Sequence, residues 1–113
     1  MTLIPIGQFS KMTRLSIKAL RLYDDNGLLP PAHVDKTTGY RYYDPTQARR
    51  AEIIRVLRSV EMPLDEIRLV VEADNHEAAH EELLKHKRRL AERLSHQERI
   101  LAYLDSIIRS KEI

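Results

Sequence analysis

The sequence contains no cysteine and no tryptophan, and only three glycines and five prolines occur among its 113 residues. Without cysteine the chain forms no disulfide, no thiolate metal site and no thiolate nucleophile. No segment approaches the roughly 20 apolar residues of a membrane span, and residues 1–6 lack the charged and apolar regions of a secretory signal. These absences predict a cytoplasmic protein built from long helices, with no membrane partner.

Charge is distributed unevenly along the chain. Residues 1–60 hold ten Lys or Arg and five Asp or Glu, a net charge of +5, whereas residues 61–113 carry a net charge of −3. This asymmetry indicates an anionic partner for the first half alone.

Two short helices are predicted in the basic half, over residues 7–13 and 16–26. Ser16 is a good N-cap for the second helix, and Gly27 suits the position just after its end. At 100° per residue, one face of that helix turns inward and the opposite face turns outward. The inward set is Ala19, Leu20 and Tyr23, and the outward set is Lys18, Arg21 and Leu22. The pair predicts a helix-turn-helix whose outward face suits the DNA major groove, with an ordinary solvated surface as the alternative.

A β-hairpin is predicted next, because β-branched and aromatic residues flank a Gly-containing turn at positions 36–39. Lys36 at its tip, beside Arg41 and the tyrosine hydroxyls, suits contact with phosphate. The alternative is a hairpin that covers the core with its tyrosines turned inward.

Two further helices follow the hairpin. Asp44 and Gln47 form a capping-box pattern at the start of the first, which carries a predicted buried stripe. The stripe is Ile53, Ile54, Val56, Leu57 and Val60. A short helix over residues 64–72 places Asp65 and Glu66 in its first turn, where the helix dipole favours acidic residues.

Residues 75–111 form one long helical pattern without glycine or proline. A heptad register places six apolar residues along one seam, interrupted by His80, Lys87 and Gln97. Such a seam predicts a coiled coil with a second chain, and folding back on the same chain is the alternative. The predicted dimerisation residues are Leu83, Leu90, Leu94, Leu101, Leu104 and Ile108.

His76 and His80 match the H-E-x-x-H pattern of zinc proteases. On a continuous helix, however, His86 projects about 120° away from His80, so the three imidazoles do not converge on one metal. A zinc hydrolase is therefore disfavoured, and we expect no enzyme activity, no metal site and no cofactor.

Four segments in order carry a family resemblance: Ile-Gly-Gln-Phe-Ser-Lys at 6–11, Lys-Ala-Leu-Arg-Leu-Tyr at 18–23, Gly-Leu-Leu at 27–29 and Gly-Tyr-Arg-Tyr-Tyr at 39–43. The sequence resembles the MerR family of bacterial transcription regulators, most of all its multidrug-sensing branch. The resemblance implies a mainly α fold, with a winged helix-turn-helix DNA-binding domain over 1–73 and an antiparallel coiled-coil helix over 74–113. It also implies a homodimer that binds a promoter spacer and distorts the DNA for RNA polymerase.

The resemblance carries roles onto individual residues. Lys18 and Arg21 match recognition-helix contacts, Tyr40 and Arg41 match wing contacts, and Tyr23 matches the final aromatic of the helix motif. Leu22 departs from the family, which has Tyr or Phe there. The full predicted DNA-binding set is Ser16, Lys18, Arg21, Leu22, Tyr23, Lys36, Tyr40, Arg41, Tyr42 and Arg58.

Multidrug-type members continue into an effector-binding domain that these 113 residues do not contain. We therefore expect any small-molecule effector to act only through a domain outside them. The alternative function is a helical dimeric interaction module without specific DNA binding.

Overall fold

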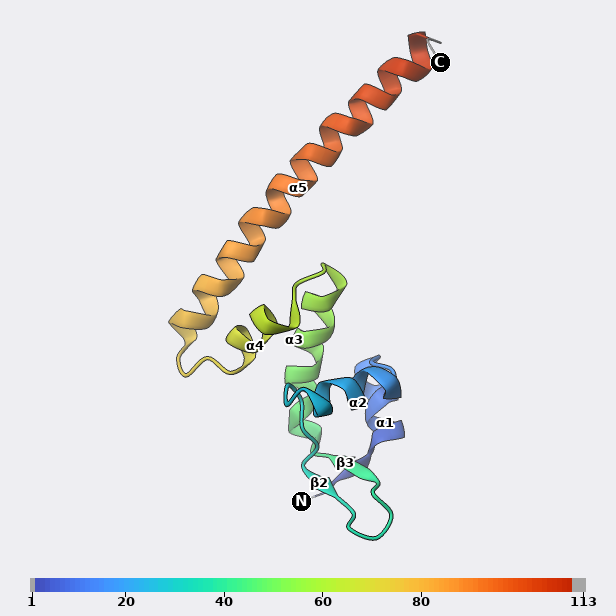
Figure 1. The fold of residues 1–113 in the computed structure, drawn as a ribbon, viewed down its shortest axis with the longest axis vertical. Coiled ribbons are helices and arrows are strands. Elements are labelled where there is room, and N and C mark those ends of the chain that lie inside the picture. The colour runs from blue at the N-terminus through green and yellow to red at the C-terminus, as the bar shows by residue number, and fades with distance from the viewer. Residues whose placement is uncertain (1, 111–113) are drawn as a thin grey trace. The chain divides into compact units, whose positions relative to one another are not determined.

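The computed structural model describes residues 2–110, which are mainly helical, as the sequence predicts (Figure 1). The chain divides into two compact units, of which the first ends at Glu72 and the second begins at Ala73. No helix within residues 2–110 is both long enough and apolar enough to cross a membrane.

The first two helices form the helix-turn-helix. Helix α1 covers Ile6–Thr13 and α2 covers Ile17–Asp25, which confirms the two predicted helices to within one residue at each end. Arg14 follows α1 with a φ of 63°, the left-handed conformation that turns the chain towards α2. The Ser16 hydroxyl accepts a hydrogen bond from the Ala19 N–H at 3.0 Å, so the predicted N-cap is confirmed.

Three short antiparallel strands form one sheet in the order β1-β3-β2. They are β1 (Ile4–Pro5), β2 (His33–Val34) and β3 (Arg41–Tyr43). Strands β2 and β3 confirm the predicted hairpin, and the register pairs Val34 with Arg41. Strand β1 was not predicted, because two residues are too short to show alternation and its partner, β3, lies far along the chain.

The turn of the hairpin is closed by Asp35. Its carboxylate accepts from the backbone N–H groups of Thr37 at 2.8 Å and Thr38 at 2.9 Å. The hydrogen bonds from Thr38 and Thr37 hold the pKa of Asp35 below its ordinary value. Gly39 completes the turn with a φ of 75°, a conformation that costs glycine little.

The capping box predicted at Asp44 and Gln47 is present, with both reciprocal hydrogen bonds formed. The first turn after it, Pro45–Gln47, is a 3-10 helix, and α3 then covers Ala48–Ser59. Helix α4 covers Leu64–Val71, one residue shorter than predicted, with the acidic first turn that the sequence indicates.

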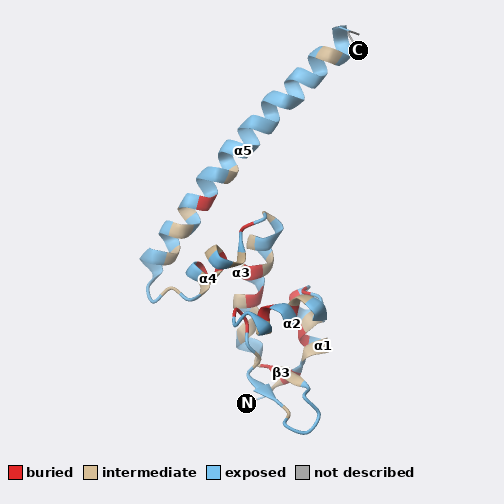
Figure 2. Cartoon of the chain, in the orientation of Figure 1, coloured by how far each residue is buried: buried red, intermediate tan, exposed pale blue. Residues whose placement is uncertain are grey.

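The core of the first unit lies between α1, α2, α3 and the sheet, where Figure 2 shows the buried positions. Phe9 of α1 stacks on Tyr43 of β3, with ring centroids 4.4 Å apart and planes 4° apart. Ile54 is fully buried as predicted, but Val56 is 47% exposed. The prediction for Val56 is wrong because α3 buries a narrower stripe, centred on Ala51 and Ile54.

Helix α5 covers His76–Ser110 and begins one residue after the predicted start, while the last predicted position, 111, lies outside the described residues. Asn75 precedes it, and its side-chain oxygen accepts from the Ala78 N–H at 2.8 Å, the bond of an N-cap. Most of this helix is exposed along its length (Figure 2).

Candidate nucleic-acid interface

Helix α2 presents two faces of different chemistry. Leu20 is fully buried, whereas Lys18 and Arg21 are exposed and Leu22 is 50% exposed. An open groove of about 580 Å³ runs along the exposed face. It is lined by Ser16, Lys18, Ala19, Arg21, Leu22 and Asp25. Two cations and one apolar side chain on a rigid helix are the groups with which a helix contacts major-groove bases and phosphates.

Tyr23 does not belong to this surface. It is only 6% exposed and lies among the buried residues of α2 with Leu20, so the structure places it in the core, and its role as a DNA contact stays a prediction. The carbonyl of Tyr23 also accepts from the N–H groups of Leu28 and Leu29, at 2.8 and 3.0 Å. Tyr23 therefore fixes the end of α2 onto the core.

Arg41 joins the hairpin to helix α2. Its Nε donates to Asp24 Oδ2 at 2.7 Å, and a second guanidinium nitrogen lies 3.9 Å from Asp25. The side chains of Arg41 and Asp24 are 26% and 22% exposed. The bond to Asp24 raises the pKa of Arg41 above its ordinary value, so the guanidinium stays charged. The predicted wing contact is thus a cation already paired within the protein, and the pair sets the position of β3 against α2.

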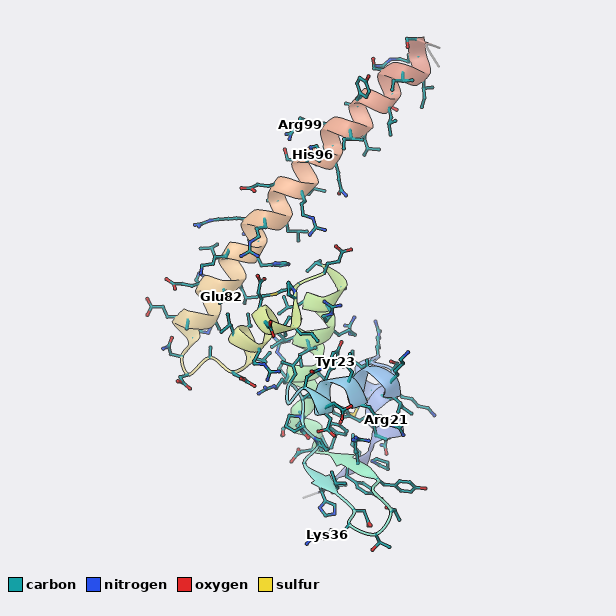
Figure 3. The ribbon with its side chains drawn as sticks, in the orientation of Figure 1. Arg21, Tyr23, Lys36, Glu82, His96 and Arg99 are labelled. Atoms are coloured by element: carbon teal, nitrogen blue, oxygen red, sulfur yellow. The ribbon has the colours of Figure 1, made fainter. Side chains whose placement is uncertain are left out.

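The hairpin tip is the most exposed part of the predicted wing. Figure 3 shows Lys36 at the end of the loop between β2 and β3. Tyr40 is 66% exposed, and Tyr42 is half-buried with its ring 6.1 Å from that of His33. Lys36 and Tyr40 are therefore available to a partner, whereas Tyr42 is partly covered.

Arg58 lies apart from these residues in the chain, at the end of α3. Its guanidinium donates to the Met62 carbonyl at 2.8 Å and so closes the turn into α4. Arg58 is exposed in the last turn of α3 and belongs to neither α2 nor the hairpin.

The sequence profile of MerR HTH family regulatory proteins matches residues 4–74, which include both helices of the helix-turn-helix and the whole sheet. The chain belongs to this family. Proteins with sequences and structures similar to this chain are also transcriptional regulators.

The transcriptional regulator BrlR of Pseudomonas aeruginosa is 37% identical over 106 residues, which cover 91% of this chain and 39% of BrlR. The multidrug-efflux transporter 1 regulator of Bacillus subtilis is 44% identical over 63 residues, or 56% of this chain and 23% of that protein. The chain thus spans less than half the length of these curated relatives. EcmrR, solved as an EcmrR–DNA complex, is 28% identical with a TM-score of 0.65, and the match covers 95% of this chain and 40% of that one.

In this MerR-family chain, three residues that sequence analysis did not single out hold the end of helix α2. Arg50 of α3 donates to the Leu28 carbonyl at 3.0 Å and lies 3.6 Å from Glu72. Arg68 of α4 donates to the Asn26 carbonyl and pairs with Glu72 at 3.2 Å. In the sequence these two arginines look like solvated surface charges. Their acceptors are backbone carbonyls, which every residue has, so no pattern of residue types reveals the hydrogen bonds.

The predicted dimerisation residues line α5. Five of the six are exposed: Leu83 at 39%, Leu94 at 56%, Leu101 at 63%, Leu104 at 47% and Ile108 at 68%. Leu90 is half-buried. Ile100 and Tyr103, which the heptad register omits, are also 45% and 67% exposed, so the apolar surface widens in the second half of the helix. Exposed apolar surface of this extent is typical of interaction sites.

The H-E-x-x-H residues lie at the start of α5, with the rings of His76 and His80 stacked and their centroids 6.4 Å apart. Among residues 2–110, no three His, Cys, Asp or Glu side chains are grouped to hold a metal ion.

Proposed function

We propose that residues 1–73 form a sequence-specific DNA-binding domain, and that α5 within residues 74–113 dimerises it as an antiparallel coiled coil. The observation that carries the proposal is the exposed Lys18–Arg21–Leu22 face of α2, to which the Arg41–Asp24 pair attaches the hairpin. The MerR membership of the chain and the DNA complex of EcmrR support it. A promoter-binding role places the protein in the bacterial cytoplasm.

Phosphate contacts give this proposal a quantitative test. Lys18, Arg21 and Lys36 are exposed and have no carboxylate partner among the described residues. The six such cations of a dimer set an upper limit of about −5 on the slope of the logarithm of the binding constant against the logarithm of salt concentration, and each cation that contacts a base instead of a phosphate makes the slope shallower. Fluorescence anisotropy with a selected duplex and a random duplex measures both slopes. A helical interaction module without DNA binding would bind neither duplex at low salt.

We further infer that the bound dimer distorts a promoter spacer so that RNA polymerase can use it. The family membership and the EcmrR–DNA complex in EcmrR-RPo support this step. The test is in-vitro transcription from promoters whose spacer is lengthened one base pair at a time around the selected site. The protein is expected to raise transcription from lengthened spacers only; equal effects at every spacer length would contradict DNA distortion.

We also infer that small-molecule effectors do not act through residues 1–113. Among residues 2–110, no aromatic side chain lines the grooves along α2, beside α1, on α3 or on α5, and aromatic residues make up only 5% of the chain. Pockets for lipophilic cations need apolar and aromatic walls. Duplex affinity at fixed salt should therefore stay constant with lipophilic cations and divalent metals. A tenfold change, about 1.4 kcal/mol of coupling, would contradict this inference.

A further inference from the structure

Leu22 is an apolar side chain within an otherwise polar surface. It is 50% exposed and lies in the groove along α2, one helical turn after Lys18 and one turn before Asp25. Its side chain is not part of the core, which α2 builds with Leu20 and Tyr23. The fold therefore does not account for an apolar residue at this position.

The position of Leu22 is fixed by its backbone. Its carbonyl accepts from the side-chain Nδ2 of Asn26 at 2.9 Å and from the backbone N–H of Asn26 at 3.0 Å. The next turn is held in place by Asp24, which pairs with Arg41 of the hairpin. Leu22 thus projects from a well-anchored helical turn, as a residue that reads one base requires.

The chemistry of the major groove assigns Leu22 a base. Thymine is the one base that presents a methyl group there, at C5, whereas adenine, guanine and cytosine present hydrogen-bonding groups and small C–H edges. A leucine placed against an amino group or a carbonyl removes water from it and supplies no hydrogen bond in return. Against a methyl group, the same leucine buries apolar surface at no such cost.

We propose that Leu22 selects thymine by contact with its C5 methyl group, while the neighbouring Lys18 and Arg21 supply the hydrogen bonds and charge. The inference rests on the proposed DNA-binding function and specifies it at one base pair of each half-site. Leu22 is then a specificity-determining residue of the α2 surface.

A single methyl group can be removed from the DNA without any other change. The preferred duplex is first selected by the 113-residue chain from a random pool, and each thymine is then replaced by deoxyuridine in turn. Removal of the contacted methyl is expected to weaken binding about fourfold in each half-site, the factor that corresponds to about 0.8 kcal/mol for one buried methyl-sized group. Affinities are measured by fluorescence anisotropy at one salt concentration.

The decisive comparison uses two leucine variants. Leu22→Ala should bind the thymine and deoxyuridine duplexes equally, because the group that contacts the methyl is gone. The matched control is Leu69→Ala, since Leu69 is 55% exposed on α4 and outside the α2 groove, and it should keep the fourfold difference. Circular dichroism melting verifies that both variants are folded.

The outcomes separate this inference from the proposed function. One outcome is that a duplex is selected, but every deoxyuridine replacement changes the affinity of the original chain and of Leu22→Ala by the same factor. The thymine contact is then wrong, and the proposed DNA binding stands. If no duplex is enriched and random DNA is not bound at low salt, the proposed function fails and the thymine contact fails with it.

Discussion

The Arg41–Asp24 pair should stabilise the first unit through the attachment of the hairpin to α2. A hydrogen bond between charged groups contributes about 1.5–3 kcal/mol, and exposure lowers that figure. Both side chains are about three-quarters buried and their atoms lie 2.7 Å apart, so we expect a coupling near the lower limit, about 1.5 kcal/mol.

A double-mutant cycle measures this coupling. The variants are Asp24→Asn, Arg41→Gln and the double change, compared by urea unfolding at one protein concentration because the stability of the proposed dimer would depend on concentration. In thermal melts of the same samples, each single variant is expected to unfold about 6–12 °C below the original chain, the shift that a loss of about 1.5 kcal/mol gives in a domain of this size.

An exposed ion pair on α3 provides the control. Arg49 and Glu52 lie 3.4 Å apart, with side chains 76% and 54% exposed, and pairs of this kind couple by about 0.5 kcal/mol or less. A coupling for Asp24 and Arg41 no larger than that of the control would refute the attachment. The salt slope of duplex binding tests the second consequence: Arg41→Gln should leave it unchanged, because a cation paired with Asp24 releases no DNA counterion.

Three further predictions concern the seam, the α2 surface and the core. Leu94→Glu with Leu101→Glu should give monomers by light scattering and lose most duplex affinity, because charges on a buried seam lack partners; an unchanged dimer would show that the register is wrong. Arg21→Ala should cost about 1–3 kcal/mol on the selected duplex only, whereas Lys36→Ala should weaken selected and random duplexes alike; equal losses for both variants would contradict base readout. Burial raises the pKa of Tyr43, so folding stability should be full below pH 10 and fall above it as the phenol ionises, and Tyr43→Phe should remove that fall in alkaline urea titrations; an unchanged fall would contradict this assignment.

The helices could be predicted because their signals are local. Ser16, the Asp44–Gln47 capping box and Gly27 each act within a few residues, and all three lie where the sequence indicates. Strand β1 could not be predicted in the same way. Its two residues acquire a strand conformation only by pairing with Tyr42 and Tyr43, and a pairing so distant in sequence leaves no periodic pattern.

Tyr23 shows a conflict between two kinds of sequence argument. Its angle on the helix places it with Leu20 on the inward face, whereas the family motif suggests a DNA contact. The structure agrees with the angle, because Tyr23 is 6% exposed. Hydrophobic periodicity identifies the side of the helix that must be buried. A match to a family motif does not by itself say whether the family keeps a residue because it binds DNA or because it packs in the core.

The basic residues show that net charge, like a motif match, does not by itself identify a binding residue. All of these residues contribute equally to the net charge of the first half. In the structure, however, Arg41, Arg50 and Arg58 each donate a hydrogen bond to an acceptor within the protein. Arg50 and Arg58 donate to backbone carbonyls that no residue pattern reveals, and Arg41 pairs with Asp24, which is 17 residues away. Three of the ten cations in residues 1–60 therefore hold α2, the hairpin and the turn before α4 in position. Of the other cations, Lys18, Arg21 and Lys36 are exposed on α2 and at the hairpin tip. Others line a second groove beside α1, namely Arg14, Arg49 and Arg55, so position rather than net charge defines the candidate interface.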